Sequence, residues 1–115
     1  MSYEKILNVL TSFGLSRDDV RVYLNLAVNG PQTLQVIQSY LQTDSTQILM
    51  SIRKLEETGL VNGAKGEFTA TPFEDALEIV VDANFAEALN VEINKDKILK
   101  QWQSYINQKL NLELR

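Results

Sequence analysis

Apolar residues recur at helical spacing in two segments at the start of the chain. In residues 4–13 they fall on one face, and Gly14 follows where a left-handed C-terminal cap is expected. Ser16 precedes the second segment, and its hydroxyl can cap the free amides of a new helix. Gly30-Pro31 ends that segment. The predicted inward side chains are Ile6, Leu7, Leu10 and Phe13 in the first helix, then Val20, Tyr23, Leu24 and Ala27 in the second.

Two further helical patterns follow, separated by a break at residues 42–44. Thr33 can cap the first of them and Asp44, or a neighbour, the second, which ends before Gly59. Two short helices joined by a short turn, the second closed by glycine, predict a helix-turn-helix. The inward residues are Leu34, Ile37 and Leu41, with Val36 and Tyr40 widening the apolar face, and then Ile48, Ile52 and Leu55.

Beyond Gly59 the pattern changes from helical to extended. Leu60-Val61 starts a strand, residues 63–66 form a glycine-bearing turn, and apolar and polar residues then alternate until Pro72. A helix-turn-helix followed directly by a β-hairpin is a winged helix. We therefore predict a mainly α fold with a small β-hairpin, in which residues 1–75 form a winged helix-turn-helix domain.

Helical periodicity resumes at Phe73. We predict a helical C-terminal extension over residues 76–115, whose last segment carries an apolar stripe that one helix cannot bury by itself. Packing against the chain's own first helix would cover this stripe, and so would self-association, which we favour as a dimerisation element. The stripe consists of Ile98, Leu99, Trp102, Tyr105, Ile106 and Leu110.

The composition removes most routes to an enzyme. The chain has 115 residues, 44% of them hydrophobic, which suffices for one compact core. It contains no cysteine and no histidine, so Cys/His zinc sites, a nucleophilic cysteine and a histidine base are excluded. The neighbouring carboxylates Asp18 and Asp19 point about 100° apart at a helix start and are better explained as helix-end charges. We expect no enzymatic activity, no metal and no cofactor.

The charge is uneven along the chain, although the net charge is only −4. Residues 1–72 carry a net −1, residues 73–94 a net −6 with no basic side chain, and residues 95–115 a net +3. An acidic helix face is usually a solvated surface. Contact with the basic tail of the same or a partner chain is the alternative, and the acidic helix 73–94 is also a possible site for a protein partner.

Neither a membrane span nor a signal peptide is indicated. The apolar runs are far shorter than the roughly 18 residues that cross a bilayer. The first ten residues carry Glu4 and Lys5 inside an amphipathic pattern, unlike a secretory signal. We expect a cytoplasmic protein with no membrane partner.

Several short motifs occur in a fixed order between residues 4 and 75. They are Phe13-Gly14-Leu15-Ser16, Val22-Tyr23-Leu24, Gly30-Pro31 and Leu55-Glu56-Glu57-Thr58-Gly59-Leu60-Val61. Their order and spacing resemble the N-terminal domain of the TrmB family of winged-helix transcriptional regulators, which are largely archaeal. The resemblance implies sequence-specific binding of double-stranded DNA by the second helix of the motif, with the wing on the backbone, usually as a homodimer. Larger family members add a sugar-binding domain, which we do not expect in 115 residues.

The second helix of the motif, which we call the reading helix because it is expected to contact bases, departs from the family pattern at its start. Family members commonly place basic residues there, whereas this chain has Ser45, Thr46 and Gln47. Fewer cations weaken the attraction to phosphate, but Gln can still pair with adenine edges, and Ser or Thr can contact bases or phosphates.

The helical spacing assigns the remaining contacts. With Ile48, Ile52 and Leu55 turned inward, we predict that Thr46 and Gln47 contact bases, that Ser51 and Lys54 contact phosphates, and that Lys65 reaches the flanking backbone. For Arg53, an ion pair with Glu57 and a contact with DNA remain equal alternatives. The predicted DNA-binding residues are Ser45, Thr46, Gln47, Met50, Ser51, Lys54 and Lys65.

A winged-helix module that binds protein, with little or no DNA affinity, is the main alternative. Its contact surfaces would be the acidic helix 73–94 and the uncharged start of the reading helix. Ionic strength separates the two functions, because DNA binding weakens steeply with salt.

Overall fold

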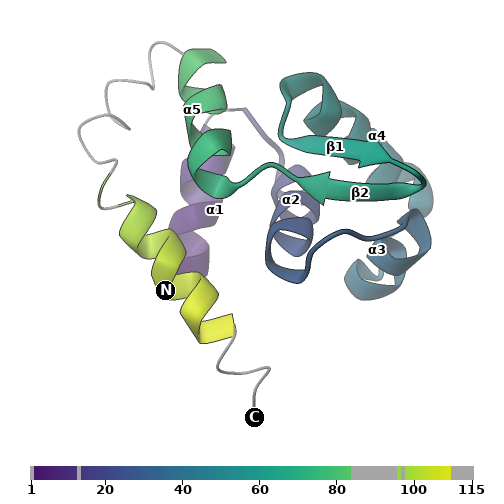
Figure 1. Cartoon of the computed structure of the whole chain (residues 1–115), viewed down its shortest axis with the longest axis horizontal. Helices are drawn as coiled ribbons and strands as arrows, with labels where there is room; N and C mark the ends of the chain where they lie inside the picture. The colour runs from purple at the N-terminus through teal and green to yellow at the C-terminus, as the bar shows by residue number, and fades with distance from the viewer. Residues whose placement is uncertain (1, 13, 84–95, 97, 110–115) are drawn as a thin grey trace.

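The computed structural model describes residues 2–12, 14–83, 96 and 98–109. The first helices are α1 (Ser2–Ser12), α2 (Arg17–Asn29), α3 (Leu34–Leu41) and α4 (Ser45–Thr58). The antiparallel strands β1 (Val61–Ala64) and β2 (Glu67–Ala70) follow, and then α5 (Phe73–Ala83). Residues 98–109 are also helical, and we call them the C-terminal helix. This order, shown in Figure 1, confirms the predicted winged-helix architecture.

Helix α2 lies at the centre of the core. Its start has the predicted cap: the Asp19 amide donates to Ser16 Oγ at 3.0 Å, and the Ser16 amide donates back to Asp19 Oδ2 at 2.9 Å. This capping box satisfies amides that have no partner within the helix. The Tyr23 hydroxyl donates to the Thr71 carbonyl oxygen at 2.6 Å, which ties α2 to the segment after β2. The buried apolar residues of α2 are Val20, Val22, Tyr23, Leu24 and Leu26.

Helices α3 and α4 form the helix-turn-helix. The Val36 amide donates to Thr33 Oγ1 at 3.3 Å, so Thr33 caps α3 as predicted. Asp44 occupies the capping position of α4, but its side chain makes no capping hydrogen bond. Gly59, with φ 85°, ends α4 in the left-handed conformation that glycine adopts without strain.

The apolar faces of these two helices differ from each other. The predicted inward residues of α4 (Ile48, Ile52 and Leu55) are all fully buried. In α3 only Ile37 is fully buried, and Val36 and Tyr40 are 49% and 53% exposed. Their prediction as part of the buried face is therefore wrong, because α3 is short and contacts the core along a narrow strip.

The wing is a tight two-stranded hairpin. Its register pairs Val61 with Ala70 and Ala64 with Glu67, leaving only Lys65 and Gly66 in the turn. Both turn residues have positive φ (56° and 80°), as a two-residue type I′ turn requires. The predicted four-residue turn at 63–66 is thus too long, because Gly63 and Ala64 belong to β1.

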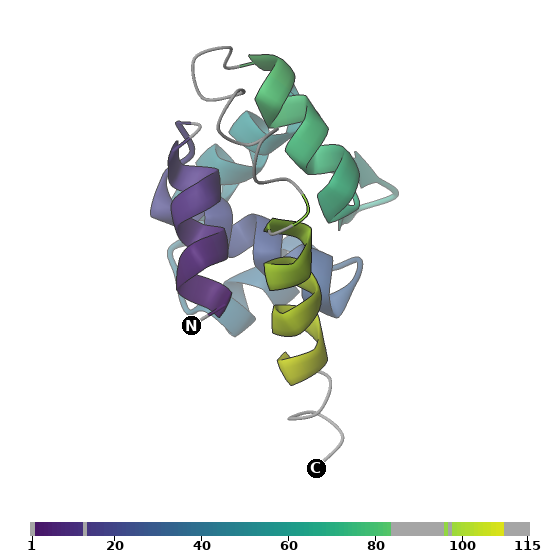
Figure 2. The same ribbon diagram turned by 90° about the vertical axis from the view of Figure 1, so that its left-hand side faces the viewer.

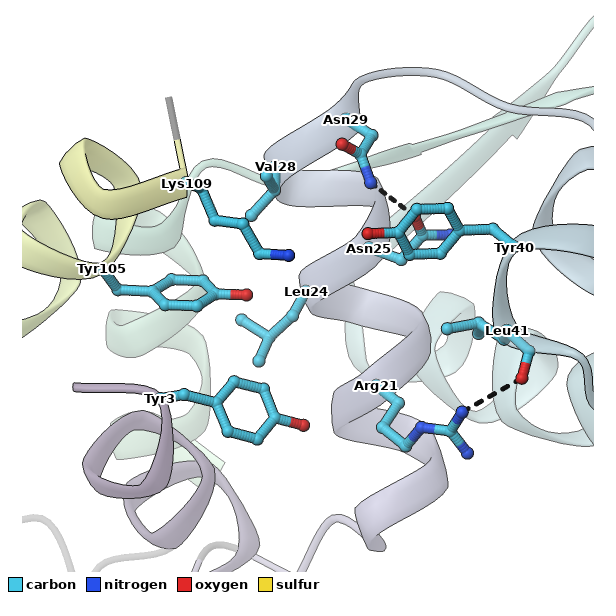
Figure 3. A pocket seen from close by; sticks show the side chains of 10 residues that line it. All are labelled: Tyr3, Arg21, Leu24, Asn25, Val28, Asn29, Tyr40, Leu41, Tyr105 and Lys109. Atoms are coloured by element: carbon cyan, nitrogen blue, oxygen red, sulfur yellow. Dashed lines mark hydrogen bonds between the residues drawn. The ribbon is translucent and has the colours of Figure 1, made fainter. Parts of the chain in front are cut away.

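The C-terminal helix packs against its own chain. The Trp102 ring stacks on Phe73 of α5 with centroids 4.5 Å apart, and Tyr105 lies 5.9 Å from the ring of Tyr3 in α1. Figure 2 shows the C-terminal helix beside α1 and below α5, and Figure 3 shows Tyr3 and Tyr105 reaching over α2. Packing on the first helix, one of the two alternatives for the apolar stripe, is therefore observed.

The stripe is only partly covered by this packing. Tyr105 is buried, whereas Ile98, Leu99, Trp102 and Ile106 are half-buried at the edge of the core. Leu110 lies outside the described residues. The predicted domain boundary at residue 75 falls inside α5, whose Phe73, Ala76 and Leu77 are buried with the rest of the core.

Candidate nucleic-acid interface

Three exposed side chains form a short stripe along one face of α4. Thr46, Met50 and Arg53 are all exposed, and their spacing of four and three residues places them on one side of the helix. Met50 is 62% exposed, which is unusual for a large apolar side chain. Ser45 and Gln47, at the start of the helix, are half-buried. We call Thr46, Met50 and Arg53 the α4 stripe.

Ser51 does not belong to this exposed face. Its side chain is buried, with 2% of its surface exposed, and its hydroxyl has no hydrogen-bond partner of ordinary geometry in the part of the chain described. The prediction that Ser51 faces outward is wrong, because residue 51 lies three positions after Ile48 and four before Leu55, on the inward flank of the apolar stripe. The predicted phosphate contact by Ser51 is therefore withdrawn.

The Lys54 ammonium is bound to other residues of its own chain. Its ammonium lies 3.1 Å from Asp19 Oδ2 and donates to the Gly14 carbonyl oxygen at 3.0 Å. Burial by itself raises the pKa of Asp19, but the Ser16 amide, the nearby Ser51 hydroxyl and the Lys54 ammonium outweigh it and hold the pKa below its usual value. Lys54 thus links the reading helix to the start of α2.

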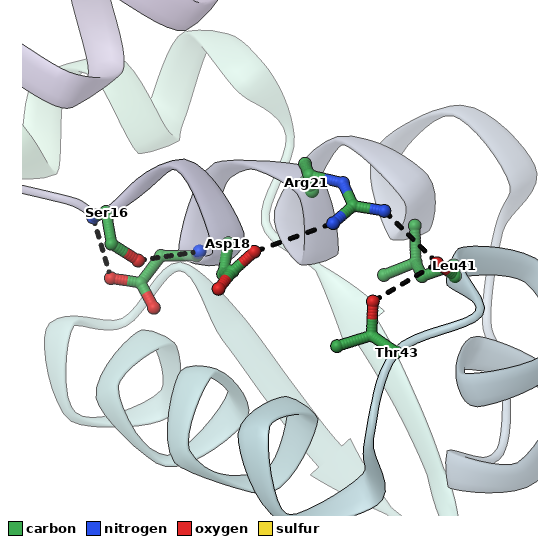
Figure 4. A network of polar contacts seen from close by, with 6 residues as sticks. Ser16, Asp18, Arg21, Leu41 and Thr43 are labelled. Carbon is green, nitrogen blue, oxygen red and sulfur yellow. Dashed lines mark hydrogen bonds and ion pairs between the residues drawn. The ribbon is translucent and has the colours of Figure 1, made fainter.

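A second polar network fixes the turn of the helix-turn-helix against α2 (Figure 4). Arg21 Nη2 donates to the Leu41 carbonyl oxygen at 3.1 Å, and Arg21 Nη1 lies 3.5 Å from Asp18 Oδ1. Thr43 Oγ1 donates to the same Leu41 oxygen at 3.1 Å. Together with the Lys54 link, these contacts attach the end of α3 and the helix α4 to α2 and the residues just before it. Sequence reasoning missed the Arg21–Leu41 and Lys54–Asp19 contacts because their partners are distant in the chain.

Two exposed cations, Arg53 and Lys65, lie on α4 and the wing. Within the described residues neither Arg53 nor Lys65 takes part in an ion pair, and the pairing of Arg53 with Glu57 left open by the sequence is not observed. Lys65 is exposed at the tip of the wing, in the two-residue turn between β1 and β2. Arg53 and Lys65 come from the two elements that the sequence assigns to DNA.

The described part of the chain contains neither a metal site nor a membrane-spanning helix. Residues 2–12, 14–83, 96 and 98–109 contain no group of three or more Asp, Glu, His or Cys side chains placed to hold a metal ion. Over those same ranges, no helix has the length and apolar character that crossing a membrane requires.

Comparison with known proteins identifies the fold and the family. The chain is similar to the crystal structure of the YusO protein from Bacillus subtilis, with a TM-score of 0.52 and 16% identity, over 96% of this chain and 84% of that one. This likeness concerns the fold alone. No curated protein matches the chain. The family model described as "Sugar-specific transcriptional regulator TrmB" matches residues 10–78, which is more than half of the chain. The chain therefore belongs to the TrmB family of transcriptional regulators.

Proposed function

We propose that this protein binds double-stranded DNA as a regulator of transcription, with α4 in the major groove and the wing on the flanking backbone. The observation that carries the proposal is the α4 stripe: an exposed face on the second helix of a helix-turn-helix, with Arg53 at one end. Membership of a family of transcriptional regulators supports the same function. A helix presented in this way fits the major groove of B-DNA.

The roles of individual residues follow from their exposure. Thr46 and Gln47, with Ser45 beside them, lie at the start of α4, where helix-turn-helix proteins contact base edges. Met50 is placed for apolar contact with a thymine methyl group. Arg53 and Lys65 supply positive charge toward phosphates, or toward guanine in the case of Arg53. Lys54 reaches phosphate only if its ammonium leaves Asp19 and Gly14, so we give it a smaller part than the sequence suggested.

We further propose that the protein acts as a homodimer. A monomer with two available cations in its binding face gains little affinity from counterion release, and a dimer doubles that number. The half-buried residues of the C-terminal helix, together with the apolar groove between that helix and α1, support a second copy at this surface. The two reading helices would then contact half-sites about one turn of DNA apart, roughly 34 Å. Light scattering tests this step: a 13.0 kDa particle at high micromolar concentration contradicts it.

DNA binding itself is tested by fluorescence anisotropy with a duplex selected from random sequences, over a range of salt concentrations. Arg53→Ala and Lys65→Ala each remove one cation per protomer, so each is expected to weaken binding and to reduce the slope of log K against log salt by about 1 per protomer, or about 2 for the dimer. Lys100→Ala is the matched control, since it removes the same charge from an exposed position on the C-terminal helix, away from the wing (Figure 1) and outside the lining of the groove proposed for the second copy. If all three variants bind as the unaltered protein does, the interface is misplaced. If no duplex is selected at all, the protein is not a DNA-binding regulator.

A protein-binding module is the second candidate function. It is favoured by the exposed apolar residues Val36, Tyr40 and Met50 and by the exposed acidic side chains Glu74 and Asp75 at the start of α5. Residues 84–94 of the acidic segment predicted as a partner site lie outside the described residues. A complex formed through apolar contacts keeps its affinity at high salt, whereas a DNA complex does not.

Three expectations stay predictions. A cytoplasmic location fits a regulator of transcription, and an archaeal source follows only from the resemblance to the family. The division into a winged-helix domain (1–75) and a helical extension (76–115) is also retained as a prediction.

A further inference from the structure

A small pocket lies where four helices meet, apart from the α4 stripe and the wing. It is formed by α1, α2, α3 and the C-terminal helix, and the accessible space inside it is about 130 Å³. That is close to the roughly 150 Å³ of a protein cavity that accommodates one benzene ring. The lining residues are Tyr3, Arg21, Leu24, Asn25, Val28, Asn29, Tyr40, Leu41, Tyr105 and Lys109.

The charge of the lining is positive. Arg21 and Lys109 line the pocket, and the lining includes no Asp or Glu, although acidic residues outnumber basic ones in the chain. Arg21 is partly compensated by Asp18 at 3.5 Å. No ion pair is found for Lys109 within the described structure. An anion therefore fits this pocket better than a cation or a neutral molecule.

Hydroxyl donors converge on the same space. In Figure 3 the hydroxyl groups of Tyr40 and Tyr105 and the ammonium of Lys109 point into the space above Leu24, and the hydroxyl group of Tyr3 lies below it. Burial, with smaller contributions from Tyr3 and Tyr40, raises the pKa of Tyr105, so its hydroxyl remains a donor at neutral pH. By contrast, Asn25 is already bonded to Gln32 and Asn29 and offers little to a ligand.

The remaining walls suit an apolar, flat body. Leu24, Val28 and Leu41 supply aliphatic surface, and the tyrosine rings supply aromatic faces and edges. A ligand with one ring and one anionic group matches the volume, the charge and the donors together. We propose that this pocket binds a small monocyclic carboxylate, whose carboxylate group accepts from Lys109 and Tyr105.

The test is an NMR titration of the full chain with benzoate, with benzamide as the uncharged isostere and inorganic phosphate as an anion without a ring. Benzoate is expected to bind with a Kd of about a millimolar or below, and to shift the amide signals around Tyr3, Leu24, Tyr40 and Tyr105 saturably. Benzamide is expected to bind at least about tenfold more weakly, because it carries no charge for Lys109.

Two variants and one control locate the site. Lys109→Gln and Tyr105→Phe are each expected to weaken benzoate binding about tenfold or more, since each removes a donor to a charged group. Lys100→Gln, at an exposed position of the same helix outside the pocket, is expected to leave it unchanged. Equal binding of benzoate by Lys109→Gln and the unaltered chain overturns the proposal, as does equal binding of benzamide or phosphate. Absence of saturable shifts up to about ten times the expected Kd also overturns it. None of these measurements involves DNA, so the result is independent of the proposed regulatory function.

Discussion

The Lys54 ammonium on the reading helix lies 3.1 Å from the buried carboxylate of Asp19 at the start of α2. The Asp19 side chain is only 5% exposed, whereas that of Lys54 is 45% exposed. Asp19 also accepts from the Ser16 amide, so one carboxylate serves both the helix cap and the ion pair. Asp19 therefore adds a polar link between α4 and the start of α2 to the apolar packing of the two helices.

Loss of the Asp19 charge is expected to destabilise the protein in acid. The pKa of Asp19 is below its ordinary value of 3.8 in the folded state, so its contribution is fully present above that value and is lost as the pH falls through the folded-state pKa. Asp19→Ala is expected to lower the free energy of unfolding at neutral pH by about 1–3 kcal/mol. Urea denaturation at pH 7 and pH 3 measures this. The difference between variant and unaltered protein should shrink at pH 3, and a constant difference would show that the charge is irrelevant.

Substitution of Lys54 is expected to lower mainly the stability of the protein, and substitution of Arg53 mainly its affinity for DNA. Lys54→Gln leaves the Asp19 carboxylate without its cation, so it should reduce stability by about 1–2 kcal/mol and alter DNA affinity less than Arg53→Gln does. Arg53→Gln removes an exposed charge without an observed ion pair, so its stability should stay within about 0.5 kcal/mol. Thermal denaturation and anisotropy on the same samples separate the two effects. The reverse pattern would mean that Lys54 is the phosphate-binding residue.

The positive charge at the tip of the wing can be removed without destabilising its turn. Lys65 has φ 56°, and asparagine adopts this conformation more readily than lysine. Lys65→Asn is therefore expected to keep or slightly raise the melting temperature while weakening DNA binding as Lys65→Ala does. Gly66→Ala, which forces a side chain into φ 80°, provides the opposite control: it should destabilise the turn by about 1 kcal/mol with the charge intact. If Gly66→Ala weakens DNA binding and Lys65→Asn does not, Lys65 does not contact the DNA backbone.

The single tryptophan reports the docking of the C-terminal helix. Trp102 stacks on Phe73 with ring planes 9° apart, so Phe73→Leu keeps apolar volume but removes the stacked ring. We expect the Trp102 emission to move to longer wavelength and the stability to fall by about 1 kcal/mol. Fluorescence spectra at low and high protein concentration provide the measurement. An emission maximum that changes with concentration but not with Phe73→Leu would place Trp102 between two chains rather than against α5.

The fold could be predicted because the helix caps and the apolar spacing in the sequence agree with the caps and the buried faces in the structure. Ser16 and Thr33 cap α2 and α3 as expected, and Ile48, Ile52 and Leu55 are buried as their spacing indicated. These features depend on neighbours within one helical turn. The change from helical to alternating periodicity after Gly59 likewise marked the wing.

The candidate site was less predictable, because its geometry depends on distant partners. The partner of Lys54 is Asp19, 35 positions earlier, and no local pattern pairs them. Ser51 lies at the border of the apolar stripe, where a helical projection alone does not decide between buried and exposed. The C-terminal stripe could be covered by either of two surfaces with the same periodicity, and only the three-dimensional arrangement distinguishes them.

Two backbone hydrogen bonds away from the tip of the wing restrict how the wing can move. The backbone of Gln32, in the loop between α2 and α3, exchanges hydrogen bonds with Phe68 of β2 in both directions, at 3.1 and 2.8 Å. The hairpin is therefore anchored at its middle to the same loop that leads into the helix-turn-helix, and it cannot swing independently of α3 and α4. In the proposed complex, a duplex that contacts both elements would meet a nearly fixed spacing between α4 and the wing, so a mismatch in groove width would be taken up mainly by bending of the DNA.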